Sequence, residues 1–215
     1  MNLLAFDTCL DKTYIALSKN NEIVANIKIK SDEKNYHSAY LISTIAKTLK
    51  DNGLTPADLD AIAINVGPGS FTGIRACTTV ARVMGQQLGI KTVGISSLEI
   101  LSNALSSDDN SIIALDARKE MAYLYDKKLV GAVSLNEACE QIKEKNCQVI
   151  TDNRLYDVFK ELSNNVIVYT DEDCELGEAL VKIALEKLKD ESTKTNWNEL
   201  MPLYIQPPPI SVKGK

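Results

Sequence analysis

An internal repeat is the feature that most constrains this 215-residue chain. The stretch LLAFDTCLDKTYIAL, which begins at Leu3, reappears in outline as IIALDARKEMAYLY, which begins at Ile112. Each copy reads as an apolar strand that ends in an aspartate (Asp7 or Asp116), then a turn and a second apolar strand. The copies share few identities, so chance similarity of two apolar strands is an alternative. The similar order of elements after each copy favours a duplicated α/β fold.

The hydrophobic periodicity extends this repeat into two halves. In the first half we expect three consecutive strands, the third with alternating apolar residues over 23–29. There follow helices over 36–50, from Thr55, over 72–88 and from Ser96, and strands over 59–66 and 91–96. In the second half we expect a helix after the capping box at 134–137, a strand over 148–151, a helix near 154–163, a strand over 166–169 and a helix near 175–189. We therefore predict an N-terminal lobe over 1–104, a shortened C-terminal lobe over 105–200 and an extended proline-rich tail over 201–215.

Composition limits the class of protein. The chain has 45% hydrophobic and 25% charged residues, a net charge of −5 and no apolar run long enough to span a bilayer. The stretch MNLLAFD has no basic residues ahead of its apolar part, so we expect no secretory signal. The five cysteines are never closer than eight residues apart, which predicts neither a disulfide framework nor a zinc knuckle and favours a cytoplasmic setting. The scattered basic residues predict poor stand-alone binding of nucleic acid.

A glycine-rich turn separates an apolar run from a helical pattern in the stretch INVGPGSFTGIR over 64–75. Glycines at 67, 69 and 73 permit a tight strand-to-helix turn with exposed backbone amides, which is the geometry of an anion cradle. Their spacing matches neither the P-loop, nor the dinucleotide fingerprint, nor the nucleophile elbow. A turn that only lets helix and sheet pack closely is an equally good interpretation.

The helix predicted over 72–88 has two apolar faces. A core stripe at helical spacing comprises Ile74, Cys77, Ala81, Met84 and Leu88, and a second face beside it comprises Ala76, Val80 and Val83. Because covering one sheet needs only one stripe, the second face predicts contact with another chain. A helix that is more deeply buried in its own domain is the alternative.

Several motifs together resemble one family. An aspartate at the end of the first strand of each half is the pattern of the actin-like ATPase and sugar-kinase architecture, the ribonuclease H-like ASKHA fold. Within that class, LAFDT, GPGSFTGIR, GISSLEIL, ALDARKEMAYLY and PLYIQ resemble the TsaB (YeaZ) family. The resemblance runs from Leu3 to about Ile205, and over 135–195 it holds only in element order. In PLYIQ, Gln206 stands where an arginine is common, so any salt bridge at that position is in doubt.

The resemblance implies a role in tRNA modification. Members of the family are subunits of the bacterial machinery that installs N6-threonylcarbamoyl on adenosine 37 of tRNAs, and they resemble their partner, the TsaD transferase, in fold. A scaffold or activating subunit is implied, which binds a TsaD-like transferase, acts beside a TsaE-like ATPase and meets tRNA only through the complex. Whether the lone chain forms a homodimer stays open. The implied partner interface comprises Tyr36, Tyr40, Ala76, Val80 and Val83.

The resemblance also implies a non-catalytic subunit without metal. The transferase binds metal through two histidines at i and i+4, whereas His37, the only histidine here, is followed by Leu41 at that spacing. Neither a histidine-based metal site nor a Ser-His-Asp triad can be built around a second histidine. A vestigial phosphate-binding site is implied, with at most weak affinity for ATP or ADP, and its residues would be Asp7, Thr8, Gly67, Gly69, Ser70 and Gly73.

Two enzymatic alternatives remain. A free-standing small-molecule kinase of the ASKHA type would hold Mg²⁺ with Asp7 and Asp116, although the second half is short for a kinase. A glycoprotease-type peptidase would use Cys9 or Ser70 as the nucleophile, with His37 as its base and no orienting motif.

Overall fold

The computed structural model describes residues 1–30, 40–106, 110–170 and 174–206. Tyr36 and His37 lie outside the described residues, as does the proline-rich tail from residue 207 onward. Within the described ranges, no helix is both long enough and apolar enough to cross a membrane.

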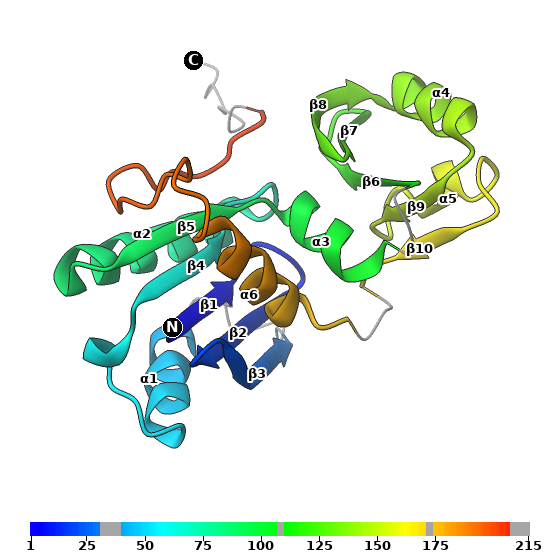
Figure 1. The fold of residues 1–215 in the computed structure, drawn as a ribbon. Helices are drawn as coiled ribbons and strands as arrows, with labels where there is room; N and C mark the ends of the chain where they lie inside the picture. Colours follow the sequence, from blue (N-terminus) through cyan, green and yellow to red (C-terminus); the bar gives the residue numbers. More distant parts are fainter. Residues whose placement is uncertain (31–39, 107–109, 171–173, 207–215) are drawn as a thin grey trace, which may run out of the picture.

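Two five-stranded sheets form the two lobes of the molecule (Figure 1). The first contains β1 (Leu3–Asp7), β2 (Lys12–Lys19), β3 (Glu22–Lys30), β4 (Ala61–Asn65) and β5 (Lys91–Ile95), in the order β3-β2-β1-β4-β5. The second contains β6 (Ser111–Asp116), β7 (Met121–Asp126), β8 (Lys128–Ser134), β9 (Gln148–Thr151) and β10 (Val166–Val168), in the order β10-β9-β6-β7-β8. In each sheet the first strand of its half is central, antiparallel to the next strand and parallel to the fourth. This shared connectivity confirms the duplicated two-lobed α/β fold.

Helices cover both faces of the first sheet. On one face lie α1 (Leu41–Asp51) and α2 (Phe71–Leu88), and a short 3₁₀ turn, η2 (Pro56–Asp58), precedes β4. On the other face lie α3 (Ser97–Leu105) and α6 (Leu176–Lys187). Side chains of β1 alternate between the two cores, because successive residues of a strand point to opposite faces: Leu4 and Phe6 pack under α1 and α2, whereas Leu3 and Ala5 pack under α3 and α6.

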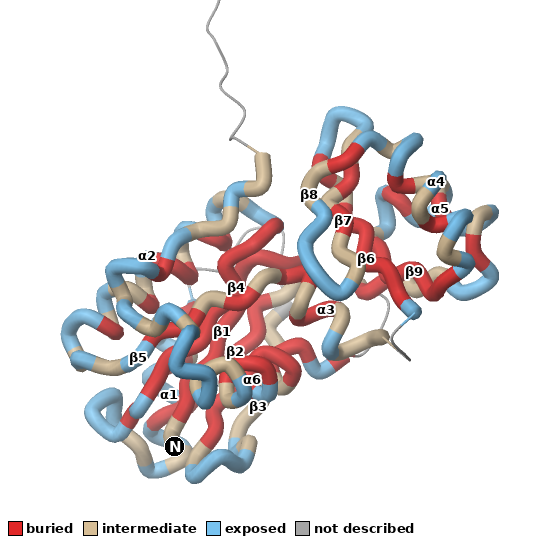
Figure 2. The backbone as a smooth tube through the Cα atoms, turned by 45° about the horizontal axis from the view of Figure 1, so that its top comes forward, coloured by how far each residue is buried: buried red, intermediate tan, exposed pale blue. Residues whose placement is uncertain are grey.

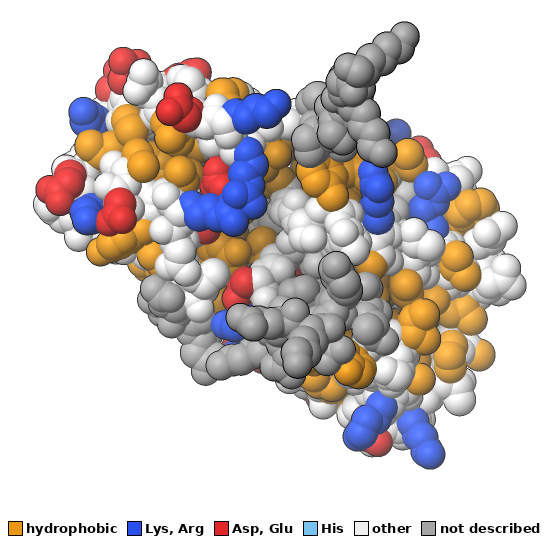
Figure 3. All heavy atoms as spheres, turned by 180° about the vertical axis from the view of Figure 1, so that it is seen from behind, with side chains coloured by type: hydrophobic (Ala, Val, Ile, Leu, Met, Phe, Trp, Pro, Cys, Tyr) orange, Lys and Arg blue, Asp and Glu red, His pale blue; other side chains and the backbone are white. Residues whose placement is uncertain are grey.

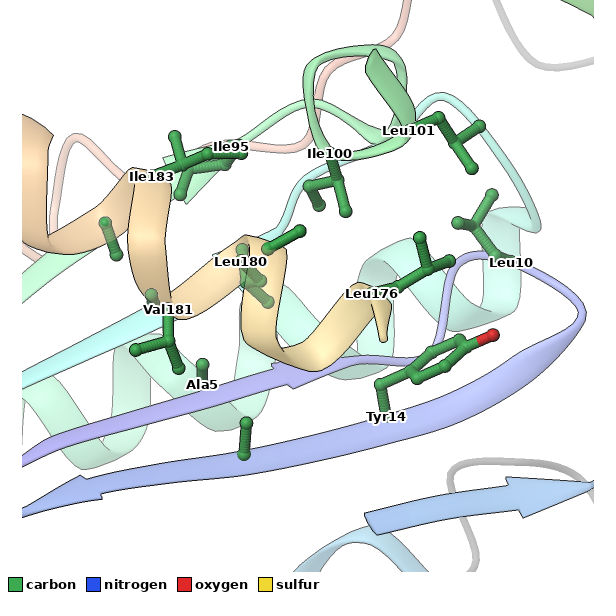
Figure 4. Packing of buried hydrophobic residues seen from close by; sticks show 14 of the residues in the cluster. Ala5, Leu10, Tyr14, Ile95, Ile100, Leu101, Leu176, Leu180, Val181 and Ile183 are labelled. Atoms are coloured by element: carbon green, nitrogen blue, oxygen red, sulfur yellow. The ribbon is translucent and has the colours of Figure 1, made fainter. Parts of the chain in front are cut away.

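Helix α6 corrects the expected grouping of elements. The sequence order placed this helix with the second half, but it contacts all five strands of the first sheet and α3. Figure 4 shows Leu176, Leu180 and Val181 of α6 beside Ala5 of β1 and Tyr14 of β2. Apolar residues surround most of the α6 circumference, so the helix is stable only where two layers enclose it. The first sheet and α3, both of which α6 contacts, provide that cover.

The second lobe is smaller and has less helical cover. Helix α4 (Leu135–Lys145) begins at the predicted capping box, where the Ser134 hydroxyl accepts a hydrogen bond from the Glu137 N–H at 3.2 Å. The helix expected near 154–163 is only the single turn α5 (Tyr156–Phe159). It ends early because the chain turns back at Ser163, whose hydroxyl donates to the Cys147 carbonyl at 2.6 Å, just ahead of β9. Figure 2 shows that burial in this lobe is concentrated in the neighbouring strands β6 and β9.

A bulge interrupts the alternation that predicted β3. The pairing of β2 with β3 shifts between Leu17 and Ser18, so that Val24 has no partner in the register. As a result Ile23 packs in the core beside α6, whereas Ala25 and Ile27 pack in the opposite core. The strand was predicted correctly, but its apolar residues do not share one face.

Candidate functional site

The carboxylate of Asp7 lies at the C-terminal end of β1 and is enclosed by its own lobe. Asp7 is 1% exposed. Its Oδ1 accepts a hydrogen bond from the Cys9 backbone N–H at 2.6 Å, and its Oδ2 accepts one from the Asn65 side-chain amide at 3.0 Å. Asn65 is itself fixed, because its Oδ1 accepts hydrogen bonds from the Gly67 N–H and the Ser97 hydroxyl. Burial raises the pKa of Asp7 from 3.8 to about 6, and the hydrogen bonds from Asn65 and Cys9 limit the rise.

The glycine turn packs directly on the backbone that follows β1. The Ser70 N–H donates to the Cys9 carbonyl oxygen at 2.8 Å. A Cβ at Gly69 would lie 2.3 Å from that same oxygen, and a Cβ at Gly73 would lie 1.8 Å from the Thr8 carbonyl oxygen. Both distances are shorter than any tolerable contact, so these positions require glycine. The structure therefore supports the interpretation that the turn lets helix and sheet pack closely.

Helix α2 begins and ends as the sequence predicts, to within one residue. Ser70 is its N-cap and accepts a hydrogen bond from the Gly73 N–H at 3.3 Å. Gly89 follows its last residue in the left-handed conformation, with φ of 65°. The Thr8 hydroxyl donates to the Gly73 carbonyl at 2.8 Å, which joins the first turn of α2 to β1.

The six residues implied in phosphate binding lie close together but differ in accessibility. Four of them, Asp7, Thr8, Gly67 and Gly73, are buried. Gly69 and Ser70 are exposed and line a cleft between the lobes. The six residues thus do not form one open cradle, and phosphate binding at them remains a prediction.

One group of potential metal ligands occurs in the described part of the chain: Asp7, Cys9 and Cys77, all buried. Each ligand atom already has a partner inside the protein. The Cys9 thiol donates to the Asn65 carbonyl at 3.2 Å, and the Cys77 sulfur accepts from the Thr8 N–H at 3.1 Å. Burial, reinforced by the neighbouring Cys77 and Asp7, raises the pKa of the Cys9 thiol well above its usual range. A metal needs the thiolate, so this donor set fits a metal poorly.

The second lobe carries the counterpart of the Asp7 site. Asp116 ends β6 as Asp7 ends β1, and its Oδ1 accepts a hydrogen bond from the Arg118 N–H at 2.8 Å, two residues on. Its Oδ2 lies 3.0 Å from Nη1 of Arg154 and 3.6 Å from Nη1 of Arg118. Asp152, after β9, accepts hydrogen bonds from the N–H groups of Asp116, Arg154 and Leu155. Burial raises the pKa of Asp152.

The sequence analysis missed three of these residues: Arg118, Asp152 and Arg154. Its comparison of the halves matched the strands and the aspartates but did not compare the residues of the turns. Two residues after each aspartate, Cys9 is the counterpart of Arg118. The turns after β4 and β9 also correspond. Asn65 accepts a hydrogen bond from the Gly67 N–H, and Asp152 accepts one from the Arg154 N–H, in each case two residues later. The signal was weak, since the paired residues differ in type.

A cleft of about 760 Å³ separates the two lobes at these strand ends. The first lobe contributes the turn after β1 and the glycine turn, including Gly69, Ser70 and Phe71. The second lobe contributes the residues around its carboxylates, namely Asp116, Arg118, Lys119, Asp152, Asn153 and Arg154. Figure 3 shows Lys and Arg side chains gathered on the side of the second lobe that faces the first. Gln206 also lines this cleft.

Four of the five residues of the predicted partner interface are described: Ala76, Val80 and Val83 belong to α2, and Tyr40 directly precedes α1. Val83 is 54% exposed and Tyr40 is 48% exposed. Ala76 and Val80 are half-buried, and Val80 also packs on the core beneath α2. Ile42 of α1, which the sequence analysis did not include, is 67% exposed. These residues leave apolar side chains at the surface of the layer that α1 and α2 form.

The segment that follows α6 runs beside α2. Its Thr195 carbonyl accepts a hydrogen bond from the Thr92 N–H at 2.8 Å, and the Leu203 N–H donates to the Val66 carbonyl at 2.8 Å. Two arginines of α2 contact it: Arg75 donates to the Tyr204 hydroxyl, and Arg82 lies over the ring of Trp197 and near Met201. These contacts occupy the side of α2 toward β5 and leave Val83 exposed.

Comparisons with known proteins agree with this architecture. A family model described as "TsaD: tRNA N6-adenosine threonylcarbamoyltransferase" matches residues 22–203. The chain is 31% identical over 178 residues to the tRNA threonylcarbamoyladenosine biosynthesis protein TsaB of Bacillus subtilis, which covers 78% of this chain and 77% of that protein. It is 31% identical over 121 residues to an uncharacterized protein of Mycobacterium tuberculosis. This second match spans 56% of each protein, so the chain covers little more than half the length of that relative.

A solved structure has a similar fold. It is a crystal structure of an uncharacterized protein with similarity to peptidase YEAZ from Pseudomonas aeruginosa, with a TM-score of 0.72 and 19% sequence identity. The match covers 95% of this chain and 99% of that one. On the evidence of the family model and the Bacillus subtilis relative, the chain belongs to the TsaB (YeaZ) family.

Proposed function

We propose that this chain is a scaffold or activating subunit that binds a TsaD-like threonylcarbamoyl transferase and supports formation of N6-threonylcarbamoyladenosine at position 37 of tRNAs. The name of the Bacillus subtilis relative supports the pathway. The observation that carries the proposed partner contact is the exposed apolar face of α1 and α2, with Tyr40, Ile42 and Val83 each about half exposed or more. Exposed large apolar side chains are typical of a protein interface where they gather on one surface.

The environment of the candidate nucleophiles supports a non-catalytic role. Cys9 is 2% exposed, its thiol donates to a backbone carbonyl, and burial raises its pKa, all of which oppose formation of a reactive thiolate. The Ser70 hydroxyl serves as the N-cap of α2. The glycoprotease alternative therefore has little support among the described residues.

The kinase alternative also has little support. Asp7 is enclosed and bonded to Asn65 and Cys9, so its carboxylate does not reach the cleft where Mg²⁺ and nucleotide would lie. Asp116 reaches the cleft but faces two arginines. We propose that the lone chain requires no cofactor and binds ATP or ADP weakly at most.

The remaining parts of the proposal concern partners and location. A TsaE-like ATPase acts in the same complex, and the chain contacts tRNA only as part of that complex. A second copy of the chain competes with the transferase for the α1–α2 face if the lone chain is a homodimer. The protein acts in the cytoplasm, where its tRNA substrates are.

Substitution of Val83 by glutamate tests the partner face. Because Val83 is 54% exposed, the charge is solvated in the free protein, and we expect native circular dichroism and an unchanged melting temperature. In a complex the same carboxylate would be buried without a partner, which should weaken binding of the transferase on the order of 100-fold. Binding is measured by calorimetry with the purified transferase from the same cell, and function by a tRNA modification assay.

Val130→Glu is the matched control. This valine on the edge strand β8 is 43% exposed and lies in the other lobe, so its substitution should leave transferase binding unchanged. Normal binding by a folded Val83→Glu variant would refute the proposed face, and so would equal losses in both variants.

A further inference from the structure

A ridge of arginine and aromatic side chains runs along the side of α2 that borders the α1–α2 face. Positions 75, 79, 82 and 86 of α2 are three or four residues apart, so their side chains share one side of the helix. The segment that follows α6 returns along this side (Figure 1), and a Cβ at Gly85 would lie 3.2 Å from the Cβ of Trp197. This arginine ridge comprises Arg75, Arg82, Trp197, Met201 and Tyr204.

Contacts within the ridge hold its two arginine side chains in place. Nε of Arg75 donates a hydrogen bond to the Tyr204 hydroxyl at 3.2 Å. The guanidinium carbon of Arg82 lies 5.9 Å from the centroid of the Trp197 ring, and Nη1 of Arg82 lies 3.3 Å from the Met201 sulfur. These contacts engage one of the five N–H donors of each guanidinium. A partner that binds the other donors therefore meets side chains that are already ordered, which lowers the entropy cost of binding.

The ridge is open to solvent and continuous with the α1–α2 face. The side chain of Met201 is 58% exposed, and Arg75 is also exposed. Val83, which belongs to the α1–α2 face, directly follows Arg82 in α2. Successive residues of a helix are about 100° apart around its axis, so the ridge and the face adjoin on the surface of α2.

The composition of the ridge is that of a protein interface. The chain has four arginines and one tryptophan, and the ridge contains two of those arginines and that tryptophan. Arginine, methionine and aromatic residues are enriched in the cores of protein interfaces, whereas lysine, glutamate and aspartate are depleted there. Tryptophan, tyrosine and arginine also dominate the binding energy of many interfaces. The ridge thus has the residues that a partner would use as anchors.

The charge around the ridge is positive in a chain that is negative as a whole. The net charge of the chain is −5, yet residues 61–98, which include α2, contain no aspartate or glutamate. The charged residues of that range are Arg75, Arg82 and Lys91. The segment after α6 adds Glu199, whose carboxylate pairs with the Lys194 amine at 3.3 Å. A partner surface that carries carboxylates beside an apolar centre complements this side of α2.

We propose that the arginine ridge extends the transferase-binding surface beyond the α1–α2 face, with its arginines bound to carboxylates of the transferase and Met201 in an apolar contact. This inference rests on the proposed function, since it assigns further contacts to the same partner. The rings of Trp197 and Tyr204 already pack against Arg82 and Phe71. Less ring surface is left for stacking with nucleobases, which favours a protein over RNA as the occupant.

Binding kinetics of the full chain with the purified transferase from the same cell test the ridge. Arg75→Glu should lower the association rate constant about tenfold at low salt, and the difference from the parent should shrink as salt screens the charges. Met201→Glu should raise the dissociation rate constant about tenfold, because it places a carboxylate in an apolar contact. Lys91→Glu is the matched control: it makes the same change of charge at an exposed position of β5 and should bind as the parent does.

Trp197 fluorescence shows whether the ridge stays intact in these variants. Trp197 is the only tryptophan of the chain and its ring lies beside Arg82, so its emission changes if the segment after α6 leaves α2. We expect native emission and a native melting temperature for Arg75→Glu and Met201→Glu, since both side chains are exposed. Weaker binding by a variant with native emission then reflects a lost contact with the transferase.

A cross-linking experiment tests the carboxylate contact with the positive charge retained. Arg75→Lys places an amine on the ridge, and a carbodiimide joins amines to carboxylates that touch them. Mass spectrometry of the cross-linked complex should find position 75 joined to an aspartate or glutamate of the transferase.

Three results would overturn the inference: Arg75→Glu and Met201→Glu bind the transferase as the parent does, position 75 is joined to a second copy of this chain, or the variants lose only affinity of the complex for tRNA. Loss of transferase binding in Val83→Glu alone would refute the ridge and leave the proposed function standing. A parent chain that does not bind the transferase would refute the proposed function itself, and the ridge with it.

Discussion

The two lobes share a sheet topology, and in each the aspartate that ends the central strand accepts a hydrogen bond from the N–H two residues later. The surroundings of Asp7, here called the closed cradle, are enclosed, whereas the surroundings of Asp116, the open cradle, border the cleft. Asp7 is 1% exposed and has a pKa raised by burial to about 6, whereas the side chain of Asp116 is 16% exposed and faces two arginines. The difference comes from the helix that follows the neighbouring strand. Helix α2 has 18 residues and a glycine turn that fits onto β1, whereas α5 has four residues. The same strand-end aspartate is thus structural under a long helix and accessible under a short one.

Gly73→Ala should break the closed cradle and has the largest expected effect. The new Cβ would overlap the Thr8 carbonyl oxygen, and because that atom belongs to the backbone of β1, relief requires α2 to move. We expect a loss of more than about 3 kcal/mol in the free energy of unfolding, the upper end of over-packing costs. Urea denaturation followed by circular dichroism measures it. Thr72→Ala, at an exposed neighbouring position, should be nearly neutral, and a similarly small loss for Gly73→Ala would contradict the close packing.

Asp7→Asn should remove a pH dependence of stability that the closed cradle creates. The pKa of Asp7 is raised on folding, from 3.8 to about 6, so the folded state binds the proton more tightly than the unfolded state. The resulting stability is fully present below about pH 4 and is lost as pH rises through about 6. A shift of this size corresponds to about 3 kcal/mol. Denaturation midpoints measured from pH 4 to 7 should fall in the parent and fall much less in Asp7→Asn.

Asp116→Asn is the control for that experiment, since it changes the open cradle and leaves Asp7 intact. It should retain the fall in stability between pH 4 and 6. An equal flattening of the pH profile in both variants would mean that the two carboxylates are not in different environments.

Arg154→Gln has the smallest expected effect on stability and sharpens the comparison. The Arg154 side chain is 55% exposed, so its ion pair with Asp116 should contribute less than about 1 kcal/mol. Asn65, which contacts Asp7 as Arg154 contacts Asp116, is fully buried. Asn65→Ala should cost several times more, because it removes one hydrogen bond from each of the Asp7 carboxylate, the Ser97 hydroxyl and the Gly67 N–H. Comparable losses in the two variants, measured by urea denaturation, would show that the second cradle is as closed as the first.

Most of the fold could be predicted from the sequence because its signals are local. The strand ending at Asp7, the N-cap at Ser134 and Gly89 after α2 each depend on residues close in the chain, and each is confirmed. The stripe on α2 was also predicted, with Ile74, Cys77 and Ala81 buried.

The predictions that failed depended on contacts between distant segments. The bulge at Leu17 moved Ile23 to the other face of the sheet, and Ser163 turned the chain before the expected helix was complete. The accessibility of the predicted phosphate-binding residues could not be read from their types, because it depends on how closely α2 lies on β1.

The sequence by itself determined the duplication, the family, and the order of the strands and helices apart from β8, which no expected element covered. It did so because hydrophobic periodicity, capping residues and the glycine turn are encoded over a few residues. Only the tertiary structure decided that α6 covers the first sheet rather than the second, that Asp7 is enclosed, and that Arg118, Asp152 and Arg154 meet at Asp116. These outcomes depend on packing between segments that lie more than thirty residues apart in the chain. A local sequence pattern does not specify which distant segments pack together.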